Sequence, residues 1–332
     1  MAVHSFYKLV LLMVLSWSAI IHGVTINLPD SATVSQPSIL TLANENTTHS
    51  LINFPAGFEV RVRYGDHLFR LIDLLRNGVA ALHPLALRDA EARTAGVHYY
   101  FRRVGDMVID VQPTHPATDI SNEVALLCIY FGIKASLTDQ RYVNARYDCI
   151  VDEVEIAHVT IEPARHRPSS KGMEESPATG ARVRDPGSIS TNDLRITNTS
   201  LKAFTPTFDF RPDGQTMTIA AVFLTAMTAI MHWGLRPKTE RLPPYTAISP
   251  GREWDAHLLF VESTPRRVRP PFFESRWAIE VAKQLPFFCA ASHMFAELDA
   301  IVTVDGVNVG AGLLVKELPA GFANSDGEVV EV

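Results

Sequence analysis

The chain has 332 residues, 47% of them hydrophobic, and a formal net charge of −6 with a pI near 6.1. This length suggests two domains, and the hydrophobic content is high enough for each to bury a core, which excludes a chain disordered throughout. Nucleic-acid binding needs clustered Lys and Arg to neutralise phosphates, so the acidic balance argues against a nucleic-acid partner. The short cluster Arg266, Arg267 and Arg269 is expected to be a solvated loop rather than an anion site.

The N-terminus has the pattern of a secretory signal. Lys8 precedes an apolar run over 9–21, and Gly23 offers a small residue for cleavage. The run is shorter than the roughly 20 residues that cross a bilayer, which disfavours an uncleaved anchor. Residues 1–23 are therefore predicted to be a signal peptide, and the mature protein is expected to be secreted, either extracellular or lumenal.

Two sequons and three cysteines fit the same compartment. Asn46 begins an Asn-x-Thr sequon and Asn198 an Asn-x-Ser sequon for N-glycosylation. Both lie in polar stretches where a surface glycan is tolerated. In an oxidising compartment one cysteine pair can close. Cys128 with Cys149 is the more local option, although Cys128 could equally be a small buried hydrophobe, and Cys289 would then be left over.

Composition divides the chain into six segments. The stretch over 163–200 is rich in Ser and charged residues and has almost no aliphatic periodicity, so it cannot recover its ordering entropy and is predicted to be a flexible linker. The full division is signal peptide 1–23, polar lead 24–55, first α+β domain 56–162, linker 163–200, second α+β domain 201–320 and C-terminal tail 321–332.

The first half begins with a strand over 58–64, where apolar residues alternate with Glu and Arg. Asp66 is expected to cap a helix over 68–82 that His83-Pro84 ends. The later elements are predicted as strands over 97–104 and 107–112 with a break at Gly105-Asp106, a helix over 121–133 started by Asn122 or Asp119, and a strand or hairpin over 148–161.

The second half shows the same plan. Its predicted elements are a strand over 203–210, a helix over 216–235, a strand over 255–262, a helix over 274–288 interrupted near Pro286, and a hairpin over 296–318 with the strong turn signal Asp305-Gly306. Strand, helix, two strands, helix and strand is the order of a ferredoxin-like βαββαβ unit with an antiparallel sheet. The fold class is therefore predicted to be α+β with two ferredoxin-like halves.

Local sequence echoes favour an internal duplication. Ala81-Leu82-His83 and Ile230-Met231-His232 end equivalent helices, and Asp148-Cys149-Ile150-Val151 is answered by Asp299-Ala300-Ile301-Val302. One segment competes with this interpretation, because 216–235 carries no formal charge over the length of a membrane span. Its four threonines and its amphipathic counterpart favour a helix buried between a sheet and the other half.

No specific catalytic or cofactor motif is present in the sequence, which disfavours a cofactor-dependent enzyme. Without a Cys-x-x-Cys pair or a Cys/His cluster, a structural metal site is not expected. The remaining candidates for a catalytic base are polar residues in apolar surroundings: Asp148, His158, His232 and Asp299. Each also has a structural interpretation, the Asp residues as turn or backbone hydrogen-bond acceptors and the His residues as helix-end or strand residues.

Three functions remain open from the sequence. The favoured hypothesis is a secreted, glycosylated α+β protein that binds an apolar small molecule or a partner between its two halves, without a cofactor. The first alternative is a cofactor-free isomerase or cyclase acting on a hydrophobic metabolite, with the four candidates above as bases. The second is a structural protein tethered to a membrane by 216–235.

Overall fold

The computed structural model describes residues 38–41, 57–101, 106–115, 118–164, 203–264, 266–318 and 328–331. All of these belong to one structural unit, residues 37–332. The expected signal peptide 1–23, both sequons (Asn46 and Asn198) and the linker from residue 165 onward lie outside the described residues.

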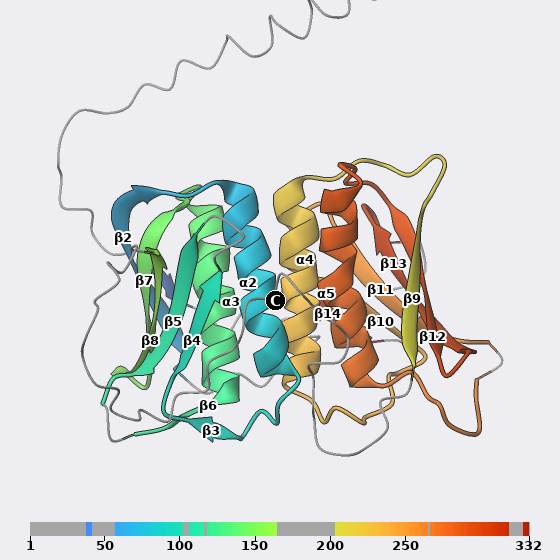
Figure 1. Ribbon diagram of the computed structural model, residues 1–332, viewed down its shortest axis with the longest axis horizontal. Helices are drawn as coiled ribbons and strands as arrows, with labels where there is room; N and C mark the ends of the chain where they lie inside the picture. Colours follow the sequence, from blue (N-terminus) through green and yellow to red (C-terminus); the bar gives the residue numbers. More distant parts are fainter. Residues whose placement is uncertain are drawn as a thin grey trace, which may run out of the picture. The chain divides into compact units, whose positions relative to one another are not determined.

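The first half is a six-stranded sheet in the order β1-β2-β7-β8-β5-β4, with two helices against one face (Figure 1). A two-stranded sheet, β3-β6, accompanies it. The elements are β1 Ser38–Thr41, β2 Glu59–Leu68, α2 Leu71–Ala86, β3 Arg93–Thr94, β4 Val97–Phe101, β5 Met107–Pro113, β6 Ile120–Ser121, α3 Asn122–Thr138, β7 Val143–Val151 and β8 Val154–Pro163.

The second half is a six-stranded sheet in the order β14-β10-β11-β13-β12-β9, again with two helices on one face (Figure 1). The elements are β9 Phe204–Phe210, α4 Ile219–Gly234, β10 Tyr245–Ser249, β11 His257–Glu262, α5 Ser275–Ala291, β12 Leu298–Val304, β13 Val307–Val315 and β14 Glu328–Glu331. Strand β14 pairs with β10 in parallel, and the other pairs in this sheet are antiparallel.

Apart from the edge strands β1 and β14, the two sheets have the same connectivity. Numbered within each half, both run 1-4-5-3-2, with helices after the first and third strands. The fold is thus α+β with largely antiparallel sheets. The ferredoxin-like strand order is not confirmed, because each half has an extra fifth strand, β8 or β13, which lies in the sheet between the third and fourth strands of that half. In the first half this strand arises because 148–161 contains a hairpin turn at Asp152-Glu153, where both residues have positive φ.

Several predicted boundaries at the first helix are wrong. Asp66 does not cap it, because β2 continues to Leu68 with a register shift after Tyr64. The N-cap of α2 is Arg70, which makes no side-chain cap and instead pairs with Asp73 at 2.6 Å between Nε and Oδ2. Pro84 lies inside the helix rather than beyond its end.

The other helix starts follow the usual capping chemistry. Ser121, rather than Asn122 or Asp119, caps α3 by accepting from the Val124 N–H, and Thr218 caps α4 by accepting from the Ala221 N–H. Pro286 does not interrupt α5, which continues to Ala291. Burial of the residues around each internal proline accounts for helices that run through it, since packing can outweigh one lost backbone hydrogen bond.

The helices of the two halves pack against one another within one continuous hydrophobic core. Two glycines lie in close contact between α2 and α4: a Cβ on Gly234 would lie 2.9 Å from the Ala86 Cβ, and one on Gly78 would lie 3.1 Å from the Met227 sulfur. The Tyr130 hydroxyl of α3 bonds the Thr228 hydroxyl of α4 at 2.9 Å. Side chains from both halves are therefore in direct contact across the described part of the interface.

Helix α4 is the segment whose apolar run allowed a membrane span. Nearly all of its residues are buried, against α2 and α3 of the first half and α5, β10 and β11 of the second. Within the described ranges, no helix combines the length and the apolar character needed to cross a membrane.

Candidate functional site

The four predicted catalytic residues lie in three separate places. Asp148 in β7 and His158 in β8 are directly opposite one another on the first sheet. His232 is buried in α4, and Asp299 lies in β12 of the second sheet. The structure thus brings only Asp148 and His158 together.

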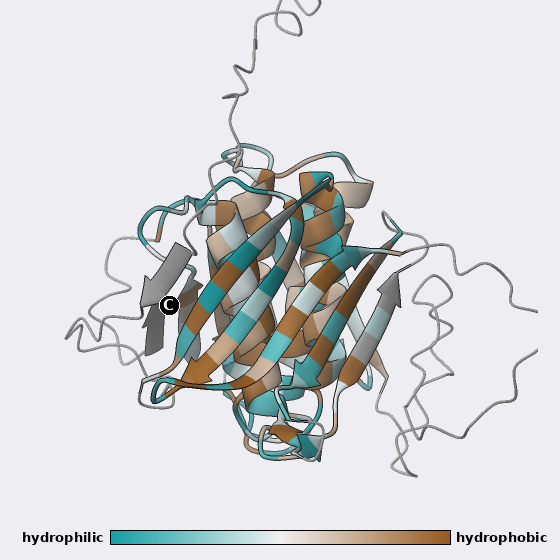
Figure 2. Ribbon diagram, turned by 90° about the vertical axis from the view of Figure 1, so that its left-hand side faces the viewer, coloured by the Kyte–Doolittle hydropathy of each residue, from teal (hydrophilic) through white to brown (hydrophobic). Residues whose placement is uncertain are grey.

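Asp148 and His158 lie on the face of the first sheet that points away from the helices. The alternate residues Tyr147 and Cys149 are buried toward the helices, and Cys149 forms a disulfide with Cys128 in α3. Figure 2 views the first sheet from this side and shows hydrophilic and hydrophobic residues alternating along its strands. The alternation is typical of an antiparallel sheet that covers a core with one face only.

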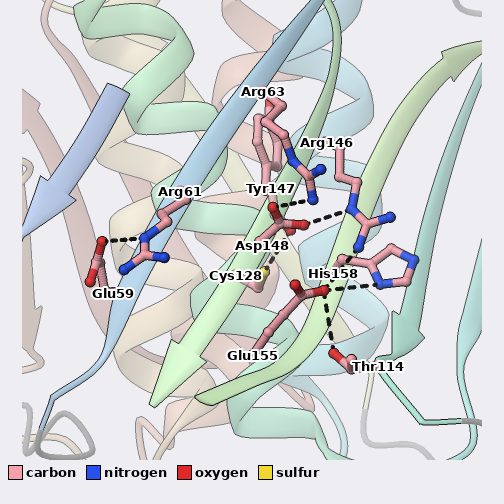
Figure 3. Close-up of polar contacts among 10 residues, drawn as sticks. All are labelled: Glu59, Arg61, Arg63, Thr114, Cys128, Arg146, Tyr147, Asp148, Glu155 and His158. Carbon is pink, nitrogen blue, oxygen red and sulfur yellow. Dashed lines mark hydrogen bonds and ion pairs between the residues drawn. The ribbon is translucent and has the colours of Figure 1, made fainter. Parts of the chain in front are cut away.

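Asp148 is the centre of an ion-pair network on this face (Figure 3). Its Oδ2 accepts from Arg63 Nη2 of β2 at 2.5 Å, and its Oδ1 accepts from Arg146 Nε of β7 at 2.6 Å. The Asp148 side chain is 8% exposed, whereas those of Arg63 and Arg146 are 56% and 38% exposed. Both carboxylate oxygens are therefore occupied beneath a layer of guanidinium groups, which disfavours Asp148 as a free general base.

The network extends to β8 through Glu155. Its Oε1 accepts from Arg146 Nη2 at 2.9 Å and lies 3.9 Å from Nδ1 of His158 (Figure 3). Burial and the positive charge of Arg146 lower the pKa of His158, so its imidazole is neutral near pH 7. Burial also lowers the pKa of Arg146, but its hydrogen bonds and charge interactions with Asp148 and Glu155 outweigh that effect and raise it overall.

A further pair lies at the edge of the network. Arg61 Nε donates to Glu59 Oε1 at 2.9 Å, and the Arg61 side chain is 45% exposed. Asp110 of β5 and Glu162 of β8 lie on the same face. The paired residues of the network are three part-exposed guanidiniums and three carboxylates, whose formal charges cancel. We call these six residues the arginine network: Glu59, Arg61, Arg63, Arg146, Asp148 and Glu155.

Sequence reasoning found only part of this network. The alternation of β2 identified Glu59, Arg61 and Arg63 as the solvent side of a strand, and Asp148 as a candidate. The sequence did not identify Arg146 and Glu155 as part of the site. These residues are nine positions apart and meet because β7 and β8 form a hairpin with a bulge after Cys149. Only the register of that hairpin could have identified them.

The second half has a reduced version of the site. Asp299 accepts from Arg211 Nε at 2.8 Å, and Asp299 and Arg211 occupy the same sheet positions as Asp148 and Arg63. Here the Asp299 side chain is 45% exposed. Leu313 lies opposite Asp299, where His158 lies opposite Asp148. The basic and acidic residues that enclose Asp148 are therefore particular to the first half.

The two helix histidines have different environments from the expected helix-end cations. Burial lowers the pKa of His232 to about 3, with a further contribution from Arg236, so its imidazole is neutral near pH 7. Burial also lowers the pKa of His83, although its Nε2 lies 2.8 Å from Glu280 Oε1 of α5, in the other half. Neither lies near Asp148 or Asp299 in the sheets.

The disulfide and the remaining thiol are both buried. Cys128 and Cys149 join α3 to β7. In the second half, the place that corresponds to this disulfide lies between Val281 of α5 and Ala300 of β12. The contact there is apolar, with Gly312 of β13 lying against both residues. Burial raises the pKa of Cys289 to about 12, so its thiol is protonated and unreactive at neutral pH.

In the part of the chain that the structure describes, no three His, Cys, Asp or Glu side chains are grouped closely enough to hold a metal ion. No family model and no curated protein matches the sequence.

Three solved structures show weak similarity. The tandem DUF26 ectodomain of the cysteine-rich receptor-like protein PDLP8 from Arabidopsis thaliana is 6% identical, with 77% of this chain and 97% of that chain covered and a TM-score of 0.21. The acyl-CoA thioesterase II TesB2 from Mycobacterium marinum is 13% identical, covering 80% and 95%, with a TM-score of 0.12. A thioesterase from Novosphingobium aromaticivorans, described as putative, is 12% identical, covering 79% and 96%, with a TM-score of 0.13. TM-scores this low assign neither fold nor function to the chain.

Proposed function

We propose that the chain is a secreted, glycosylated binding protein, and that its arginine network recognises a ligand bearing carboxylate or sulfate groups. The observation that carries the proposal is the difference between the halves. The second sheet has the same strand order, and at the equivalent positions its described residues form one exposed pair, Arg211–Asp299. The full network is therefore not required to build this sheet, which favours a functional role for it.

The geometry of the network suits anion recognition. Guanidinium groups bind carboxylate and sulfate oxygens through planar, paired N–H donors, and less entropy is lost when the group is already held in place. Asp148 holds Arg63 and Arg146 from below through one N–H group of each, and Glu155 takes a second from Arg146. The remaining N–H groups lie on part-exposed side chains and are available to an incoming anion.

An apolar small molecule between the halves has less support. The close approach of α2 and α4 at Gly234 and the Tyr130–Thr228 hydrogen bond leave the described contact occupied by protein. The isomerase or cyclase alternative also has less support, because His232 and Asp299 lie apart from Asp148 and His158, and two arginines hold Asp148. A partner at the outer sheet face is the form of the binding hypothesis that the geometry favours.

Secretion and glycosylation remain parts of the proposal that rest on the sequence. The disulfide between Cys128 and Cys149 supports them, since disulfides persist mainly in oxidising compartments. The common connectivity of the halves, together with the equivalent pairs Arg63–Asp148 and Arg211–Asp299, supports an internal duplication, after which the two copies diverged in the rest of the network.

The test is binding of two polymers, heparin for sulfate groups and polyglutamate for carboxylates, measured by isothermal titration calorimetry. We expect the protein to bind at least one of them, and Arg63→Ala to weaken that binding roughly tenfold, the loss typical of one charge-assisted hydrogen bond. Arg211→Ala, which removes the equivalent arginine of the second half, is the matched control and should bind like the unaltered protein. Binding of neither polymer, or equal loss in both variants, contradicts the proposal.

A further inference from the structure

A second charged surface lies far along the chain from the arginine network, in the connection between β11 and α5. Residues 266–273, here named the basic loop, run Arg-Arg-Val-Arg-Pro-Pro-Phe-Phe. Val268 is 91% exposed, the largest exposed fraction among the large hydrophobic residues that the structure describes. Arg266 and Arg269, on either side of it, are also exposed.

The basic loop is anchored from below by a buried acid. Glu262, at the end of β11, has a side chain only 2% exposed and accepts from Arg241 Nε and Arg266 Nε, each at 2.6 Å. Arg241 also donates from Nη2 to the Arg267 carbonyl at 2.8 Å. A carboxylate held by two arginines at the base of the loop is a strong constraint on its path.

Contacts within the loop complete the anchoring. Arg267 Nε donates to the Pro271 carbonyl at 3.0 Å, and the guanidinium of Arg241 lies 4.6 Å from the ring centroid of Phe272. Phe273 is fully buried in the core. Val268 is therefore held outward by a fixed frame, so its exposure is a built feature of the surface.

The loop also concentrates positive charge on an acidic protein. Arg266, Arg267 and Arg269 of the loop, with Arg241 in contact with it, give four positive charges against one negative charge on Glu262, an excess of three in a chain whose net charge is −6. The adjoining charged residues form neutral pairs, Arg236 with Glu240 and Arg276 with Glu274. They leave the excess of the loop uncompensated.

We propose that the basic loop docks the protein on an anionic lipid surface. An apolar tip flanked by arginines matches the layering of such a surface, where anionic headgroups lie outside an apolar interior. Val268 would enter the headgroup boundary while the arginines contact phosphate and carboxylate groups. A soluble acidic segment would account for the charge but would leave the exposed valine without a partner, which is why the lipid surface is favoured.

The test is co-flotation of the full chain with phosphatidylcholine vesicles, with and without phosphatidylserine, at low ionic strength. We expect binding only to the phosphatidylserine vesicles, and loss of it at high salt. Arg269→Glu changes the charge by two units and should weaken binding roughly 25-fold, from about fivefold for each charge near the membrane. Val268→Asp should also lose binding, and circular dichroism should show both variants folded, since both side chains are exposed.

Two controls separate this proposal from its rivals. Arg93→Glu makes the same charge change at an exposed residue of β3 and should leave vesicle binding unaltered, as should Arg211→Ala beside the second sheet. Failure of the unaltered protein to bind phosphatidylserine vesicles, or equal loss with Arg93→Glu, overturns the proposal. Binding to polyglutamate through the basic loop without vesicle binding also overturns it and assigns the loop to an acidic protein partner.

Discussion

The replacement Asp148→Asn tests whether the arginine network is a built site or an ordinary polar surface. The change keeps the shape of the side chain and removes the charge that holds Arg63 and Arg146. A hydrogen bond to a charged group contributes roughly 1.5–3 kcal/mol when buried. Because the two guanidiniums are 56% and 38% exposed and water can solvate them, we expect a total loss of about 2 kcal/mol in the free energy of unfolding.

Asp299→Asn provides the matched measurement in the second half. Asp299 and Arg211 are 45% and 36% exposed, and exposed ion pairs contribute only about 0–1 kcal/mol. The assay is urea unfolding followed by circular dichroism, with thermal unfolding as a second readout. Asp148→Asn should lower Tm by roughly 4–8 °C and Asp299→Asn by much less. Equal effects of the two replacements would refute the claim that burial distinguishes the two sites.

Three more predictions concern other parts of the chain. Because the folded-state pKa of His232 is lowered to about 3 from an unfolded value near 6.5, its contribution to stability is complete above about pH 6.5 and is lost as the pH falls toward 3. His232→Phe should therefore flatten the fall in unfolding free energy between about pH 6.5 and pH 4 by up to roughly 1.4 kcal/mol per pH unit, and an unchanged slope contradicts this. Cys128→Val with Cys149→Ala copies the apolar contact of the second half and should cost up to roughly 3 kcal/mol in urea unfolding, the chain-entropy value for a closed loop of this length; no loss would mean that the disulfide contributes little. Expression in a eukaryotic secretory host should give protein in the medium whose mass falls on glycosidase treatment, and Asn46→Gln with Asn198→Gln should abolish that fall; intracellular, unglycosylated protein would contradict the proposed secretion.

The sequence predicted the elements best where hydrophobic period and turn chemistry agree. Asp305-Gly306 marked the turn between β12 and β13, and both residues have the positive φ that a tight hairpin turn requires. The long apolar helix at 216–235 corresponds to α4, buried among helices of both halves. Each of these signals is local, so a single sequence contains it.

The errors came from contacts that are distant in sequence. We expected Pro84 to end one helix and Pro286 to interrupt another. Instead, Pro84 lies inside α2 and Pro286 inside α5, beside the buried residues Leu85 and Leu285. Asp66 had the chemistry of a cap, yet β2 runs on past it. In the candidate site, Arg146 and Glu155 meet through hairpin register, which a bulge shifts by one residue.

The most direct test of the account is amide hydrogen exchange, with and without whichever of the two polymers binds. We expect added polymer to slow exchange in β2, β7 and β8, the strands that carry the arginine network, and to leave exchange in the equivalent strands β9, β12 and β13 of the second half unchanged. Slowed exchange confined to the helices between the halves, or to the second sheet, would contradict it.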